Sequence, residues 1–491
     1  MSGSGVADAV WALLWGVNVL VLGYFLLLNG VYLLTTLAAF RALRRYPRRL
    51  KTVEVEELMR TAGALPVSLV VPAYNEGASC VEATRALLTL RYPDYHILFV
   101  NDGSTDETLE RMVAAYEMEP APLAPTAGLA TGAVRGIWRS RRNPNLWLID
   151  KENGGKADAQ NAGLNYCRTP LFGAIDADSL LEPDAVTRVV RAFLEDARTV
   201  AAGGVIRIVN GCAVRAGQVV DVRLPRNLLA RFQVLEYLRA FLSGRMGWDA
   251  LGAPLIISGA FGIFHRATVV EAGGFDRTTV GEDMELTVRL HRHCRARGVP
   301  YRIRFVPDPV AWTECPEDVR SLGRQRDRWQ RGLMESMWRH RTMLLNPRYG
   351  AVGLLAYPYF FFLEMLGPVI EAVGFVAFAV TVLAGGASAA YVGAFLGVAV
   401  LLGMALSLAA VGLEELTFRR YTRTRSLVAI FGLAILENLG YRQLNAYWRI
   451  RGFITKLRGG TGWGDMRRRG FGTGAGNGSG RAVGDGAGVD A

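Results

Sequence analysis

Apolar runs near both ends of the chain constrain its fold more than any other feature. Residues 9–40 (AVWALLWGVNVLVLGYFLLLNGVYLLTTLAAF) carry no charged side chain and are long enough for one tilted membrane span. A buried soluble helix is the alternative. The next residues, RALRRYPRRLK, form a basic cluster of the kind that stays cytoplasmic. The segment ahead of the run holds Asp8 and no basic residue, so a cleaved signal peptide is not expected, and the N-terminus is predicted to lie outside.

A second apolar block lies in the last third of the chain. One run starts near Tyr349 and another at Tyr391, and a short stretch of small residues between them predicts a helical hairpin. The third run, residues 426–444 (SLVAIFGLAILENLGYRQL), is shorter and more polar. Either this run spans the membrane, or it lies along the membrane surface. A span would place the basic segment RIRGFITKLRGG outside, whereas basic segments usually stay on the cytoplasmic side.

Composition is typical of a membrane protein that carries a soluble domain. The 491 residues are too many for one ordinary core, and a hydrophobic share of 51% with a mean hydropathy of +0.19 is high for a soluble protein. The net charge of +12 fits anionic lipid or a phosphate-bearing substrate. No zinc-finger or helix-turn-helix pattern occurs, so nucleic acid is not expected as a partner. Five scattered cysteines predict buried free thiols.

From Pro66 to about Leu345 the pattern changes to short apolar runs that alternate with amphipathic stretches. Each of four runs predicts a buried strand ending in polar residues: VSLVVPAY, HILFVND, LWLIDKENGG and LFGAIDAD. Residues 78–90 and 107–116 show helical spacing. Strands alternating with helices predict an α/β fold with a mostly parallel sheet and its chemistry at the carboxyl ends of the strands. Residues 119–136, rich in Pro, Gly and Ala, predict a variable loop.

Acidic motifs fall at the ends of these runs. Asp176 and Asp178 follow the run LFGAI, and alternate residues of an extended segment point to one side, so both carboxylates can face a hard cation such as Mg²⁺ or Mn²⁺. A lone D-x-D also arises in surface turns. Asp102 fits recognition of a nucleobase or ribose, and it equally fits an Asx turn or a helix cap. Asp283 begins a helix, where a carboxylate is common for structural reasons, and it is also a candidate general base.

The segment QRDRW, residues 325–329, lies between these carboxylates and the second apolar block. Arg328 can hold a diphosphate through two hydrogen bonds, and Trp329 offers a flat face for a sugar ring. A basic amphipathic helix on a membrane surface would show the same pattern. Together with the carboxylates and the apolar runs, the segment indicates an enzyme that acts on an anionic substrate at a membrane face.

The chain resembles the membrane-embedded family 2 glycosyltransferases. Seven motifs occur in the order seen in that family: VVPAYNE, VNDGS, NGGKADAQN, DAD, SGAFGIF, GED and QRDRW. The resemblance covers about residues 66–345 and the arrangement of one span before and several after. It implies a GT-A glycosyltransferase domain, as in the synthases of cellulose, hyaluronan, chitin oligomers and poly-N-acetylglucosamine. QVLEYLRAFLSGR and GWGDMRRRGF are most similar to bacterial poly-N-acetylglucosamine synthases.

The resemblance implies a role for each residue that matches a family motif. Asp283 would be the catalytic base, Asp178 would coordinate Mg²⁺ or Mn²⁺, and Asp176 would contact the donor diphosphate. The acceptor would meet Ser258, Gly259 and Trp329. The donor would also meet Ala73, Tyr74 and Glu76 around uridine, Asp102 at the uracil, Lys156 and Asp158 beside the nucleotide, and Gln325 and Arg328 at the diphosphate.

Two departures from the family pattern stand out. Gly281 occupies the position where the better-known synthases have Thr before the Glu-Asp pair, which bears on fine positioning and leaves the carboxylates in place. The gating-loop pattern of cellulose synthase is not found in the C-terminal part, which disfavours cellulose as the product.

These observations predict an inverting, metal-dependent hexosyltransferase that uses a UDP-sugar, UDP-GlcNAc or UDP-glucose, to extend a β-linked polysaccharide processively. One alternative is a non-processive transferase with a lipid-linked acceptor. Another is a non-catalytic glycan-export subunit, which would bind UDP without turnover. The expected partners are the UDP-sugar, a glycan acceptor and the lipid bilayer, and an accessory export or synthase subunit is left open.

The predicted protein is a multi-pass protein of the cell inner (plasma) membrane with its catalytic domain in the cytoplasm. Its expected parts are a tail (1–8), a transmembrane helix (9–40), a basic cytoplasmic linker (41–65), a GT-A catalytic domain (66–345), transmembrane or interfacial helices (349–446), a basic interfacial segment (447–471) and a disordered Gly-rich tail (472–491).

Overall fold

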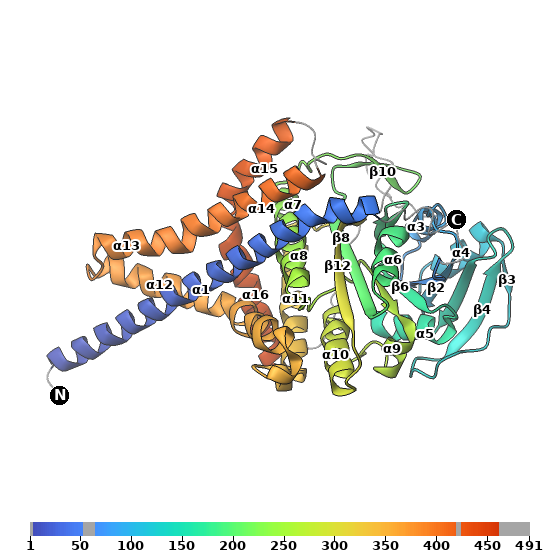
Figure 1. Cartoon of the computed structure of the whole chain (residues 1–491), viewed down its shortest axis with the longest axis horizontal. Helices are drawn as coiled ribbons and strands as arrows, with labels where there is room; N and C mark the ends of the chain where they lie inside the picture. The colour runs from blue at the N-terminus through green and yellow to red at the C-terminus, as the bar shows by residue number, and fades with distance from the viewer. Residues whose placement is uncertain (1–2, 53–63, 419–423, 461–491) are drawn as a thin grey trace, which may run out of the picture.

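The computed structural model describes residues 3–52, 64–418 and 424–460. An α/β unit occupies one side of the molecule, and long apolar helices from both ends of the chain project from the other side (Figure 1). The sequence correctly predicts an α/β unit joined to apolar helices before and after it, whereas the sheet itself is mixed, with parallel strands at its centre and antiparallel pairs toward both edges. The predicted tail at 472–491 lies outside the described residues.

One ten-stranded sheet organises the α/β unit, with the order β3-β4-β5-β2-β1-β6-β11-β8-β12-β7. Its four central strands are parallel and match the four apolar runs singled out in the sequence. They are β1 (Val67–Ala73), β2 (Tyr95–Asp102), β5 (Leu146–Lys151) and β6 (Leu171–Ile175). Because these strands are parallel, their carboxyl ends meet at one edge of the sheet, where the acidic motifs begin.

The remaining strands add antiparallel pairs to this centre. β11 (Phe261–His265) lies antiparallel between β6 and β8 (Thr199–Ile208), and β12 (Arg302–Thr313) runs parallel to β8. The short β7 (Ser179–Leu181) closes one edge. At the other edge, β3 (Met118–Pro120) pairs with β4 (Val134–Ser140). The prediction of a loop over 119–136 was therefore wrong at both ends. The main chain of β4 pairs with the edge of β5, and β3 pairs with β4 in turn. These pairings extend the sheet through a stretch whose apolar side chains do not alternate.

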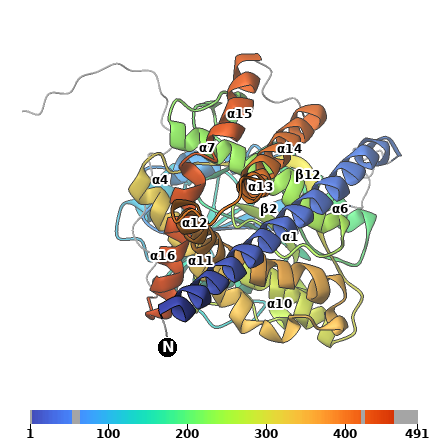
Figure 2. The same cartoon turned by 90° about the vertical axis from the view of Figure 1, so that its left-hand side faces the viewer.

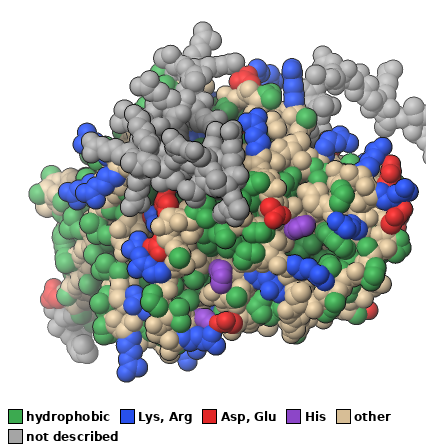
Figure 3. Space-filling view, turned by 45° about the vertical axis from the view of Figure 1, so that its right-hand side comes forward, with side chains coloured by type: hydrophobic (Ala, Val, Ile, Leu, Met, Phe, Trp, Pro, Cys, Tyr) green, Lys and Arg blue, Asp and Glu red, His purple; other side chains and the backbone are tan. Residues whose placement is uncertain are grey.

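Side chains of β1 show how the sheet is buried on both faces. Leu69 and Val71 pack into one apolar cluster, whereas Val70 packs into another on the opposite face. Successive side chains of a strand point to opposite faces, so a continuous apolar run suits a strand covered on both sides. The outer surface of the unit carries Lys and Arg side chains dispersed among apolar and acidic ones (Figure 3).

Five helices accompany these strands in the first part of the unit. They are α3 (Cys80–Leu87), α4 (Thr108–Tyr116), α5 (Lys156–Tyr166), α6 (Ala185–Glu195) and α9 (Arg266–Glu271). The first two match the helical spacing at 78–90 and 107–116.

The five cysteines are free thiols, four of them buried and Cys212 half-buried.

Two helices of the described chain are long and apolar enough to cross a membrane, over Val6–Tyr46 and Ala389–Leu413. The first lies within α1 (Gly3–Thr52), and the second comprises α13 (Ala389–Leu396), a π-helical turn and the start of α14 (Leu402–Phe418). A bent pair, Val352–Met365 and α12 (Gly367–Leu383), would make a third span if it counts as one, with a bend of 49°. In Figure 2, α1 runs diagonally across the molecule, and α12, α13 and α14 lie along one side of it.

The third C-terminal apolar run is divided by a sharp turn. α15 (Thr424–Leu436) ends before Gly440, whose φ is +102°, and α16 (Tyr441–Leu457) follows. α16 packs along α11 (Val319–Arg339), the helix that carries QRDRW. Arg449 donates to Gln330 at 2.9 Å, and Lys456 pairs with Glu335 at 2.6 Å. The basic segment after the run therefore docks on the α/β unit through ion pairs.

Candidate active site

A cavity of about 1440 Å³ lies where the α/β unit meets the apolar helices. Its walls come from the end of β6, the start of α10 (Glu282–Ala296), α11, the segment from α7 (Leu228–Leu238) to α8 (Met246–Ala250), and parts of α1, α12 and α16. Nine of the residues predicted for catalysis or binding line this one cavity: Lys156, Asp176, Asp178, Ser258, Gly259, Asp283, Gln325, Arg328 and Trp329.

Lys156 ties together two of the acidic motifs. Its ammonium lies 2.6 Å from a carboxylate oxygen of Asp176 and 2.9 Å from one of Glu282. Burial opposes its positive charge, but Asp176, Glu282 and Asp283 together raise the pKa of Lys156 above its ordinary value. Burial in turn raises the pKa of Glu282, with Lys156 acting against this effect. Lys156 starts α5, so the loop NGG brings this cation to the ends of the strands.

Asp283 lies in the first turn of α10 and points toward the loop before β11. One carboxylate oxygen accepts a hydrogen bond from the main chain of Gly259 at 2.9 Å. A Cβ on Gly259 would lie 3.0 Å from the Lys156 ammonium and 3.3 Å from the Asp283 carboxylate. A side chain at this position would crowd both charged groups. Gly259 thus lies beside the candidate base, and contact of Ser258 and Gly259 with the acceptor stays a prediction.

Asp178 follows Asp176 in the turn after β6 and also lines the cavity. No group of three or more His, Cys, Asp or Glu side chains that could hold a metal ion exists among the described residues. Mg²⁺ is commonly held by one or two carboxylates together with substrate phosphates and water. Two carboxylates at the edge of a large open cavity fit this mode of binding, whereas they do not fit a cage built from protein ligands alone.

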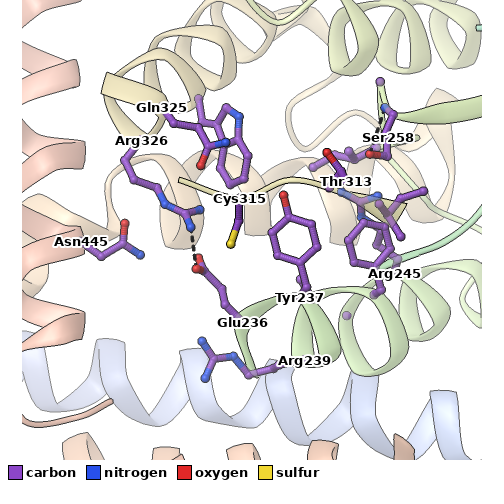
Figure 4. Close-up of a pocket in the computed structure, with 18 of the residues that line it drawn as sticks. Glu236, Tyr237, Arg239, Arg245, Ser258, Thr313, Cys315, Gln325, Arg326 and Asn445 are labelled. Atoms are coloured by element: carbon purple, nitrogen blue, oxygen red, sulfur yellow. Dashed lines mark hydrogen bonds and ion pairs between the residues drawn. The ribbon is translucent and has the colours of Figure 1, made fainter. Parts of the chain in front are cut away.

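The QRDRW segment divides its side chains between two surfaces of α11. Gln325, Arg328 and Trp329 line the cavity, whereas Asp327 binds Arg331 at 2.9 Å and contacts α16. Arg326 stacks on the Trp329 ring at 4.4 Å and pairs with Glu236 at 2.7 Å (Figure 4). One face of the indole is therefore already covered by Arg326. Because 43% of the Trp329 surface is exposed, a sugar ring would contact the other face.

Asp102 and Asp158 do not line this cavity. Both carboxylates contact the ammonium of Lys151, a fully buried residue at the end of β5. The Lys151 nitrogen lies 2.5 Å from an oxygen of Asp102 and 2.7 Å from an oxygen of Asp158. The Asp102 carboxylate also accepts hydrogen bonds from the main chain of Gly154 and Gly155 at 3.0 Å and 2.8 Å. Contact of Asp102 with uracil stays a prediction, and the observed role of its carboxylate is to hold the NGG loop in place.

A second cation completes the surroundings of Asp158. Arg277 donates to it at 2.8 Å. Burial opposes ionisation of Asp158, but the hydrogen bonds from Lys151 and Arg277 outweigh it and lower the pKa of this carboxyl group. Sequence analysis missed Lys151, although its place in the run LWLIDK, within an otherwise apolar strand, marked it as a charge in need of a partner.

The three residues predicted around uridine lie at the end of β1, outside this cavity. Ala73 is buried, Tyr74 is half exposed, and Glu76 accepts a hydrogen bond from Ser79 at 2.7 Å. They share the carboxyl edge of the sheet with Asp102, since β1 and β2 are parallel neighbours. Their binding of uridine stays a prediction.

The cavity continues between the apolar helices, where sequence analysis named no residue. Arg239 binds Glu437 at 2.5 Å, and Arg449 binds Glu364 at 3.1 Å. Glu371 and Arg442 also line this part. Charged residues inside apolar helices are costly in a bilayer unless they are paired or face a polar space. Their presence within hydrophobic runs was the signal that the sequence offered.

Comparisons with known proteins agree with this geometry. The family model "Glycosyl transferase family group 2" matches residues 172–406, and "Glycosyl transferase family 2" matches residues 68–122. The chain is 27% identical over 274 residues to a poly-β-1,6-N-acetyl-D-glucosamine synthase of Staphylococcus aureus, covering 56% of each protein. It is 25% identical over 277 residues to the synthase of Staphylococcus epidermidis, covering 55% of this chain and 56% of that protein. The chain thus spans about half the length of the curated relatives it matches.

Solved structures with a similar arrangement include a mannosyltransferase of Pyrobaculum calidifontis, solved with GDP-mannose and Mn²⁺. It is 20% identical, covers 84% of this chain and 99% of its own, and has a TM-score of 0.47. TarS of Staphylococcus aureus (residues 1–349) is 15% identical, covers 77% of this chain and 92% of its own, and has a TM-score of 0.36. On the two family models and the synthase relatives together, the chain belongs to the family 2 glycosyltransferases.

Proposed function

We propose that this protein is a membrane-bound, inverting glycosyltransferase that moves a sugar from a UDP-sugar to a growing β-linked glycan. One observation carries the proposal. A single cavity joins the carboxylates at the strand ends, the helix start with Asp283 and the QRDRW helix to charged side chains on apolar helices. A donor can therefore react at one end of a polar space whose other end is built from the helices that would cross the membrane.

The proposed reaction is a single displacement. An acceptor hydroxyl oxygen forms a bond to C1 of the donor sugar while the bond from C1 to the diphosphate oxygen breaks. The hydroxyl proton passes to the Asp283 carboxylate, and the bonding electron pair leaves with the diphosphate. Gly259 supports this role, because its main-chain hydrogen bond at 2.9 Å holds Asp283 toward the cavity.

Cationic side chains support binding of the leaving group. Arg328 lines the cavity on α11 and can hold phosphate oxygens in a fork, while Lys156 lies between Asp176 and Glu282. Asp178 and Asp176 would hold Mg²⁺ or Mn²⁺ together with the diphosphate. A bound divalent ion neutralises charge that develops on the departing diphosphate.

The donor sugar is proposed from the relatives. Poly-β-1,6-N-acetyl-D-glucosamine synthases are named for a polymer of N-acetylglucosamine, so UDP-GlcNAc is the first candidate and UDP-glucose the second. Repeated addition without release is favoured by the extension of the cavity beyond Asp283 toward Tyr32, Tyr359 and Arg449, which leaves room for sugars already joined. The catalytic unit is proposed to face the cytoplasm of a multi-pass inner-membrane protein, where nucleotide sugars are found.

The decisive experiment presents the purified full chain in lipid nanodiscs with a panel of radiolabelled UDP-sugars and Mn²⁺ or Mg²⁺. We expect one UDP-hexose or UDP-N-acetylhexosamine to yield labelled glycan and UDP. Long products that form without accumulation of short intermediates indicate processive synthesis. Addition of one sugar to a lipid extract supports the non-processive alternative, and UDP binding without turnover of any donor supports the non-catalytic export subunit.

A further inference from the structure

Arg245 lies at the end of a π-helical turn, Arg239–Arg245, which joins α7 to α8. π-helical turns are rare and concentrate at functional sites. The turn is held against α1 by a hydrogen bond of 2.5 Å between the hydroxyls of Thr36 and Ser243. Gly247, just after the turn, packs so closely on α1 that a Cβ there would lie 2.5 Å from the Thr35 carbonyl oxygen. The backbone that carries Arg245 is therefore held against α1 at two neighbouring points.

The guanidinium of Arg245 forms no ion pair with a carboxylate among the residues that the structure describes. It stacks on the Phe241 ring at 3.9 Å, and its buried Nη1 makes no hydrogen bond within the described part of the chain. Three other cations of the cavity are neutralised, since Lys156, Arg239 and Arg326 each bind a glutamate or aspartate at 2.5–2.9 Å. A buried donor without an acceptor is costly, so this position is built to meet an oxygen that the chain itself does not supply.

The surroundings of Arg245 indicate where that oxygen belongs. Arg245, Ser258, Thr313 and Tyr237 all line the cavity, and Figure 4 draws them in the same part of the view. Burial lowers the pKa of Arg245 to about 10, and the nearby Asp283 carboxylate and Tyr237 partly oppose this effect. The guanidinium and the candidate base therefore face the same part of the cavity.

We propose that Arg245 binds the acceptor: its guanidinium donates a hydrogen bond to an oxygen of the terminal sugar of the glycan and holds that sugar beside Asp283. This inference rests on the proposed function. The acceptor is favoured over the donor because the diphosphate has its own candidates at the strand ends and on α11. Arg245 belongs to the segment that packs on α1, and it lines the same cavity as the charged residues of the apolar helices.

The test compares donor and acceptor use in the full chain in nanodiscs. Arg245→Gln removes the charge and the fork of donors, Arg245→Lys keeps the charge alone, and Arg231→Gln is the matched control on α7 outside the cavity. The measurements are UDP affinity by calorimetry, hydrolysis of the UDP-sugar to free sugar, and transfer to the β-linked oligosaccharide of the sugar that the wild type transfers. Thermal unfolding in detergent reports whether each variant is folded.

For Arg245→Gln we expect the acceptor concentration at half-maximal rate to rise by about tenfold or more, since a charge-assisted hydrogen bond is lost. UDP affinity should stay within about twofold and donor hydrolysis should continue, and Arg245→Lys should be intermediate. Acceptor dependence equal to that of the wild type overturns the inference, and so does a parallel loss of UDP affinity in folded Arg245→Lys, which assigns the residue to the donor. If the wild type transfers no sugar from any donor, the proposed function fails and this inference with it.

Discussion

Gly281 and Gly332 pack backbone against backbone, so that a Cβ on either one would lie 2.9 Å from the Cα of the other. Gly281 precedes the first turn of α10, which carries Asp283, and Gly332 belongs to α11, three residues after Trp329. The contact therefore sets the distance between the candidate base and the QRDRW helix. It also accounts for glycine where better-known synthases have Thr, because a larger side chain would meet the α11 backbone.

A methyl group at this contact should uncouple the two motifs. We expect Gly332→Ala to lower transfer activity at least tenfold and to destabilise the protein, since overpacking typically costs about 1–3 kcal/mol and outweighs the gain in helix propensity from alanine. Gly393→Ala in α13 is the control, because a Cβ there meets no atom within 4 Å. The measurement is activity together with thermal unfolding in detergent. If Gly332→Ala keeps the transfer activity and the melting temperature of the wild type, the close contact between α10 and α11 is not needed for either.

The carboxylate of Asp283 is expected to be needed for chemistry and dispensable for donor binding. A general base contributes about 10²–10⁴-fold, so Asp283→Asn should reduce transfer by at least about a hundredfold while UDP affinity is kept. Steady-state transfer and calorimetric UDP titration check both parts. Near-normal turnover would move the base elsewhere, with buried Glu282 the first candidate, and loss of UDP binding with poor folding would make Asp283 a structural residue.

A contrasting variant separates donor binding from chemistry. Arg328→Ala removes a side chain that can hold phosphate oxygens bidentately, so UDP affinity should fall along with transfer. The pair of variants therefore gives opposite results in the same titration. Equal UDP affinity in Arg328→Ala and the wild type would remove Arg328 from the diphosphate site.

Lys151 is predicted to be a structural cation for the catalytic edge of the sheet. Lys151→Met leaves the buried carboxylates Asp102 and Asp158 without the charge that they share, and removal of one partner from a buried pair typically costs about 3–5 kcal/mol. We expect a clearly lower melting temperature, measured by scanning fluorimetry. A melting temperature equal to that of the wild type would show that both carboxylates are satisfied without Lys151.

The pH dependence of this network follows from the lowered pKa of Asp158. Its folded value lies below the ordinary 3.8, so its contribution to stability is present above about pH 4 and is lost as the pH falls through the folded pKa. The wild type should therefore lose stability in acid over this window, and Asp158→Asn should flatten that part of the profile. Parallel acid profiles of the two proteins would contradict the assignment.

Removal of divalent ions should abolish transfer. EDTA is expected to stop sugar transfer and Mg²⁺ or Mn²⁺ to restore it, because Asp176 and Asp178 are the candidate oxygen ligands at the proposed diphosphate site. Asp178→Asn should raise the metal concentration needed for half-maximal UDP binding. Full activity in metal-free buffer would refute metal dependence.

The basic residues after the first apolar run predict the orientation of the protein. The cluster at 41–51 should keep the α/β unit on the cytoplasmic side. Protease added to intact cells should spare this unit, and protease added to inside-out vesicles should digest it, as followed by immunoblotting of the two halves. Digestion from outside the cell would reverse the predicted topology.

Local sequence patterns were enough to predict the parts of this protein that depend on local physics. Continuous apolar runs marked β1, β2, β5 and β6, because strands buried on both faces need apolar side chains at every position. The uncharged run at 9–40 marked α1, and polar residues after each strand marked the edge where parallel strands end. The order of motifs such as GED and QRDRW then indicated the family.

The tertiary structure alone decided which of those residues meet. Asp102 and Asp158 share a lysine that is fully buried, whereas Asp176, Asp283 and Arg328 share a cavity, although all five look alike as polar residues beside apolar runs. The two ends of the stretch 119–136 likewise become strands only because they pair with each other and with β5, and their own side-chain pattern does not indicate this. Arg245, Glu364 and Arg449 enter the site only because helices far apart in the chain pack together, and no local pattern encodes that distance.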